Sequence, residues 1–95
     1  MGEQIMTLHP AGKQGVNIDR AKYELIRQAI IASVQQRGEM PFGELGAAVA
    51  ANLSEPFDGS IGWYTIAVKL DLEARGVIER LPGRSPQVIR LVQAP

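Results

Sequence analysis

The chain has 95 residues, enough for one modest hydrophobic core, so we expect a single domain over 1–95. The absence of cysteine excludes disulfides and thiolate sites, and no apolar run suggests a membrane span or a secretory signal, so a cytoplasmic location is expected. Ten basic and ten acidic residues cancel, but residues 39–73 hold six acidic residues against Lys69, a balance of −5.

Residues 1–17 are predicted to form an N-terminal extended arm, with "EQIMTLHP" as a short strand or extended segment that ends at Pro10. A first helix is expected over 17–38. Asp19 is its expected N-cap, apolar residues recur at steps of three and four from Tyr23 to Val34, and Gly38 suits its end.

"EMPF", residues 39–42, is long enough only for a short strand. A second helix is predicted from Phe42 to the residues before Pro56, and a third from about Ser60 to Arg75, with Asp58 or Ser60 as its cap. The segments 77–81 and 87–92 alternate in the manner of strands and are joined by a short loop.

This order of elements is that of a winged helix, so the predicted fold class is α+β. It comprises three helices plus a small antiparallel β-hairpin wing over 18–95, with the N-terminal extended arm before them. "LEARGVIER", residues 72–80, resembles the junction between third helix and wing in such domains. "FDGSIGWYTIAVKLDLEARGVIER" with "SPQVIRL", "LHPAGK" and "YELIRQAI" resembles a small family of uncharacterised bacterial single-domain winged-helix proteins. The resemblance implies the fold and supplies no catalytic residues.

The sequence offers little catalytic chemistry. His9 is the only histidine, and beside Pro10 it is expected to be a solvated or capping group. "HPAGKQG" departs from the phosphate-binding loop pattern, because Gln14 follows Lys13 where Ser or Thr is needed. We therefore expect no catalytic residues, no metal, no cofactor and no small-molecule ligand, and we do not expect an enzyme.

The third helix carries two apolar faces. One, with Thr65, Val68 and Leu72, is expected to pack on the other helices. Lys69 and Glu73 lie on one side between the faces, and Asp71 and Arg75 on the other. The second face is the candidate protein interface, and it consists of Trp63, Ile66, Ala67, Leu70 and Ala74. Either other segments of the same chain cover it, namely the N-terminal arm or the C-terminal β-hairpin wing, or a second chain does.

The leading hypothesis is a non-enzymatic interaction module that forms a homodimer through this face. The alternative is a DNA-binding transcriptional regulator that contacts DNA through a basic wing with Arg80, Arg84 and Arg90. The acidic segment 39–73 disfavours this alternative, because it contains the helix that would enter the groove and would meet phosphate with like charge. No membrane partner is expected.

Overall fold

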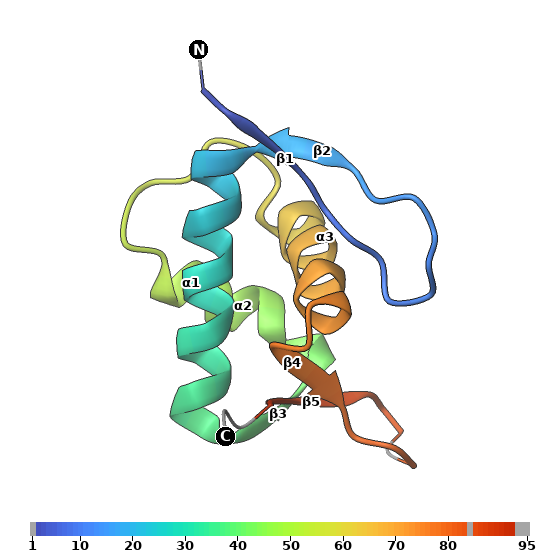
Figure 1. Cartoon of the computed structure of the whole chain (residues 1–95). Coiled ribbons are helices and arrows are strands. Elements are labelled where there is room, and N and C mark those ends of the chain that lie inside the picture. The colour runs from blue at the N-terminus through green and yellow to red at the C-terminus, as the bar shows by residue number, and fades with distance from the viewer. Residues whose placement is uncertain (1, 84, 93–95) are drawn as a thin grey trace.

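Three helices lie between two small antiparallel sheets in the computed structural model, which describes residues 2–83 and 85–92 (Figure 1). The predicted α+β class is confirmed. In chain order the elements are β1 (Gln4–Met6), β2 (Asn17–Asp19), α1 (Arg20–Arg37), β3 (Glu39–Pro41), the 3-10 turn η1 (Phe42–Glu44), α2 (Leu45–Asn52), α3 (Ile61–Ala74), β4 (Ile78–Arg80) and β5 (Val88–Leu91).

Helix α1 has the two caps that the sequence predicts. The Asp19 side chain accepts a hydrogen bond from the Lys22 backbone N–H at 3.1 Å. Gly38 ends the helix with φ of 80°, a left-handed conformation that glycine adopts without steric cost. The helix begins at Arg20, directly after the predicted cap, while Asn17–Asp19, which the predicted helical segment also included, form strand β2.

Helix α2 is shorter than predicted. Residues Phe42–Glu44 form a 3-10 turn before it, and Leu53 already has an extended backbone with ψ of 133°. The helix therefore ends at Asn52, four positions before Pro56. Its short inward face contributes Leu45 and Val49 to the core.

Helix α3 begins where a predicted cap lies, because Ser60 Oγ accepts a hydrogen bond from the Trp63 N–H at 3.1 Å. Thr65, Val68 and Leu72 are buried, as predicted for the inward face. Gly76, with φ of 77°, follows the helix end.

Strand β5 is the centre of the three-stranded sheet. It pairs with β4, with Glu79 opposite Arg90, and on its other side with β3, with Met40 opposite Ile89. The two strands predicted near the C-terminus are present, but the sheet is more than a hairpin because β3 completes it. The winged-helix assignment stays a prediction.

The N-terminal segment is a hairpin rather than a single extended arm. Strand β1 pairs with β2, with Ile5 opposite Ile18, so residues 4–19 form an antiparallel N-terminal hairpin. The predicted division between residues 17 and 18 falls inside β2. Strands β1 and β2 lie at the end of the molecule opposite to the three-stranded sheet, and the connection between them extends from there alongside α3 (Figure 1).

One hydrophobic core joins these elements. Helix α1 contributes the largest share of it, and β2, β3, α2, α3, β4 and β5 supply the remainder. The buried apolar residues are Ile18, Tyr23, Ile26, Ala29, Ile30, Val34, Met40, Leu45, Val49, Val68, Leu72, Ile78 and Ile89.

Candidate functional site

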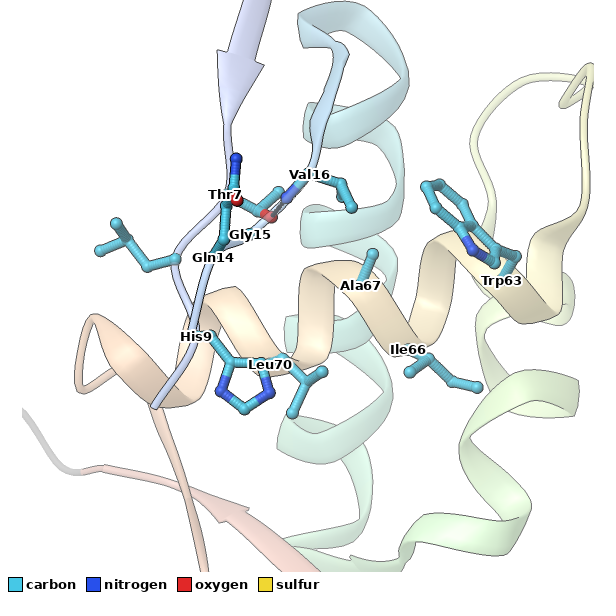
Figure 2. A pocket seen from close by; sticks show the side chains of 10 residues that line it. Thr7, His9, Gln14, Gly15, Val16, Trp63, Ile66, Ala67 and Leu70 are labelled. Atoms are coloured by element: carbon cyan, nitrogen blue, oxygen red, sulfur yellow. Dashed lines mark hydrogen bonds between the residues drawn. The ribbon is translucent and has the colours of Figure 1, made fainter. Parts of the chain in front are cut away.

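An apolar groove of about 200 Å³ lies between α3 and the N-terminal hairpin (Figure 2). We call it the α3 groove. Helix α3 forms one wall of it and the hairpin forms the other. Its lining residues are Thr7, Leu8, His9, Gln14, Gly15, Val16, Trp63, Ile66, Ala67 and Leu70.

The rim of the α3 groove exposes large apolar side chains. Trp63 and Ile66 are 49% and 50% accessible to solvent, and Leu8 and Val16 from the hairpin are exposed as well. Among the residues that the structure describes, these four are the majority of the six exposed large apolar side chains. A concentration of this kind on one face is typical of an interaction surface.

The structure brings together four of the five residues predicted for the interface. Trp63, Ile66, Ala67 and Leu70 follow one another along α3 and line the groove, with Trp63 at the end far from His9 (Figure 2). Ala74 lies elsewhere, in a second hollow that the hairpin also borders. The N-terminal hairpin thus borders this face of α3, while the end of the face with Trp63 and Ile66 remains half exposed.

A buried carboxylate attaches the hairpin to the helices. Asp71 is completely buried, and its Oδ1 accepts a hydrogen bond from the Leu8 backbone N–H at 2.8 Å. The Tyr23 hydroxyl of α1 donates to Oδ2 at 2.5 Å, and Arg75 Nε donates to the same carboxylate at 2.9 Å. A buried carboxylate needs such donors, because an unpaired charge in the interior is costly.

These contacts change the protonation equilibria of both partners. Burial, together with the hydrogen bond to Asp71, raises the pKa of Tyr23 to about 12. The hydrogen bond to Asp71 also raises the pKa of Arg75. Tyr23 is therefore a neutral donor, and Arg75 a permanent cation, at any physiological pH.

The stem of the hairpin depends on close backbone packing. The Thr7 N–H donates to the Val16 carbonyl at 2.8 Å, and Thr7 Oγ1 accepts from the Val16 N–H at 2.9 Å (Figure 2). A Cβ atom on Gly15 would lie 1.8 Å from the Thr7 carbonyl oxygen. Only glycine permits the two strands to approach this closely.

A family model described as "Family of unknown function (DUF6958)" matches residues 4–89. The chain belongs to this family. The match includes the N-terminal hairpin and both walls of the α3 groove. Comparison with the curated proteins and with the solved structures gave no match. The family description names neither a fold nor an activity, so it does not test the predicted winged-helix signature.

Two of the arginines predicted to contact DNA, Arg80 and Arg90, have acidic neighbours in this DUF6958 chain. Arg90 Nε donates to Glu79 Oε2 at 2.6 Å, and Arg80 Nε lies 3.8 Å from Glu73 Oε2. Arg84 lies outside the described residues. His9 accepts a hydrogen bond from the Ala11 N–H through Nδ1 at 3.1 Å, which is the local capping role expected of it.

Sequence reasoning placed Lys69 and Asp71 beside the apolar faces and gave neither a buried role. Both are buried. Lys69 forms an ion pair with Glu73, donates to Gln87 Oε1 at 2.5 Å and lies 4.6 Å from the centre of the Phe42 ring. The pairs Lys69–Glu73 and Asp71–Arg75 at i,i+4 spacing were the available signal, but that spacing is equally common on exposed helix surfaces.

Within residues 2–83 and 85–92, no group of three or more histidine and carboxylate side chains is placed to hold a metal ion. In the same part of the chain, no helix has both the length and the apolar character needed to cross a membrane.

Proposed function

We propose that the chain is a non-enzymatic interaction module that forms a homodimer through the α3 groove. The observation that carries this proposal is the half-exposed pair Trp63 and Ile66 beside exposed Leu8 and Val16. Burial of apolar area is the main driving force of association, and aromatic residues are enriched at the centres of interfaces.

The size of the groove supports a protein partner over a small molecule. At about 200 Å³ it is smaller than the roughly 300–1,000 Å³ typical of ligand pockets. It has room for one large side chain. In a twofold dimer each copy presents the same surface, so Trp63 of each copy is available to enter the groove of the other.

The polar side chains near the α3 groove are occupied by structural hydrogen bonds, and this supports a non-enzymatic role. Asp71 and Tyr23 are hydrogen-bonded to each other and hold structural segments together. His9 Nδ1 serves a local turn. None of these contacts has the form of a base that activates a nucleophile.

We further propose that the fold is a winged helix. The order of β3, α2, α3, β4 and β5, with β5 between β3 and β4, supports this assignment. A winged helix alone does not imply DNA binding. The alternative, a DNA-binding regulator, requires Arg80, Arg84 and Arg90 to meet phosphate, whereas Arg80 and Arg90 lie beside Glu73 and Glu79.

The test places a charge in the proposed interface. Ile66→Lys changes a half-exposed side chain of α3, so we expect the monomer to fold and the dimer to be lost. Val92→Lys is the matched control, because Val92 is similarly exposed but does not line the α3 groove. Sedimentation at micromolar concentration measures both. A wild-type monomer, or an Ile66→Lys dimer, would contradict the proposal.

A further inference from the structure

The tip of the N-terminal hairpin, residues 8–15, has little attachment to the rest of the molecule. Six of its eight residues are exposed, and only His9 and Gly15 are partly buried. In the described part of the chain, the bond from the Leu8 N–H to Asp71 is the one hydrogen bond between the tip and a helix. The tip's other hydrogen bonds, from the Ala11 and Gly12 N–H groups to His9, are internal.

The stem below the tip is anchored far more firmly. Thr7 and Ile18 are buried, Ile5 packs against the core, and the Thr7–Val16 hydrogen bonds close the hairpin. A segment with a fixed stem and one contact at its tip can open locally without unfolding the core.

We infer that the hairpin tip is a flap that Asp71 latches against α3, and that the latched flap forms the second wall of the α3 groove. Leu8, His9, Gln14 and Gly15 of the tip line that wall. Release of the Leu8 N–H removes this part of the wall and opens the α3 groove, while Thr7 and Val16 of the stem stay in place. The latch stands on its own, whereas its effect on self-association rests on the proposed homodimer.

Asp71 suits the role of a latch because its other contacts do not depend on the tip. Tyr23 and Arg75 hold the carboxylate in place from α1 and α3. Its oxygen therefore remains positioned when the tip departs, and the flap is able to return to a preformed acceptor.

Two substitutions of Leu8 separate the effect of its backbone hydrogen bond from the effect of its apolar side chain. Leu8→Pro removes the N–H donor and leaves Asp71, Tyr23 and Arg75 unchanged. Leu8→Ala removes the apolar side chain and keeps the donor. Trypsin cleavage after Lys13, an exposed residue of the tip, reports opening of the flap. Because a hydrogen bond to a charged acceptor is lost, we expect cleavage of Leu8→Pro to be roughly 10- to 100-fold faster than wild type. We expect Leu8→Ala to stay within about twofold.

Hydrogen exchange in the unmodified protein provides a second measurement. The Leu8 amide is expected to exchange slowly although the residue is 44% exposed. Fast exchange at Leu8, or equal cleavage of Leu8→Pro and wild type, would overturn the latch. Sedimentation of the same variants tests the coupling, since Leu8→Pro must weaken the dimer more than Leu8→Ala does. A monomeric wild type would reject the proposed function while the cleavage rates still decide the latch.

Discussion

Two buried threonines differ in whether their hydroxyl groups have partners. Thr7 Oγ1 accepts from the Val16 N–H at 2.9 Å. Thr65 Oγ1 is buried and has no hydrogen-bond partner among the described residues. A buried hydroxyl without a partner costs free energy, whereas a satisfied one contributes modestly to stability.

The two threonines therefore respond oppositely to replacement by valine, which has nearly the same shape. Thr65→Val is expected to raise the free energy of unfolding by about 1 kcal/mol, because no hydrogen bond is lost. Thr7→Val is expected to lower it by about 1 kcal/mol, since the Val16 N–H loses its acceptor. Thermal unfolding measures both as Tm shifts of roughly 4–8 °C in opposite directions. Equal destabilisation by the two changes would show that the Thr65 hydroxyl is satisfied.

Tyr23 makes stability depend on alkaline pH. Its pKa is about 12 in the folded chain against 10 for a free tyrosine, so folding favours the neutral hydroxyl. The stabilisation that Tyr23 provides is complete below pH 10 and is lost as pH rises from 10 to 12, because the unfolded chain ionises first. The stability advantage of wild type over Tyr23→Phe should therefore shrink by up to about 1.4 kcal/mol per pH unit in that window. Denaturant unfolding at pH 8, 10 and 11 measures it. An advantage that stays constant would contradict the role of Tyr23.

At the scale of the element, the N-terminal hairpin depends on Gly15. A methyl group there would meet the Thr7 carbonyl oxygen at 1.8 Å, and this backbone atom cannot rotate away. We expect Gly15→Ala to open the stem and to lower the free energy of unfolding by about 1–3 kcal/mol. Hydrogen exchange of the Thr7 and Val16 amides, together with Tm, measures the effect.

Gly46→Ala is the matched control for this substitution. Gly46 lies in α2 and has open space where a Cβ would be added. Because alanine favours helix over glycine by about 1 kcal/mol, the control is expected to be neutral or stabilising. If Gly15→Ala behaved in the same way, the close approach of the two strands would not be essential.

The elements differ in how well the sequence predicts them. Helices α1 and α3 follow from apolar periodicity and from the caps Asp19 and Ser60, which are local signals. The N-terminal hairpin cannot be predicted from such local signals, because its stability comes from contacts between residues distant in the chain. Leu8 and Asp71 are separated by 63 positions, and no local pattern links them. The same distance explains why the sequence located the exposed face of α3 but left open whether the N-terminal arm or a second chain lies against it.

At the scale of the whole molecule, the acidic middle of the chain is less negative than its residue count suggests. Asp71 pairs with Arg75, and Glu73 lies beside both Lys69 and Arg80. Glu44 also pairs with Arg37 at 2.6 Å, so at least three of the six acidic residues in 39–73 have a cationic partner. Charge counts along a sequence do not separate such internal pairs from a surface potential, and the sequence argument against DNA overstated the field around α3.

Trp63 links the fluorescence of the protein to the state of the α3 groove. It is the only tryptophan in the chain, and it lies half exposed at the edge of the α3 groove. The indole fluorescence of the unlabelled protein therefore comes from this one place. A second copy or any other occupant that excludes water from the groove will shift that emission to shorter wavelength, so the fluorescence of Trp63 reports whether the groove is occupied.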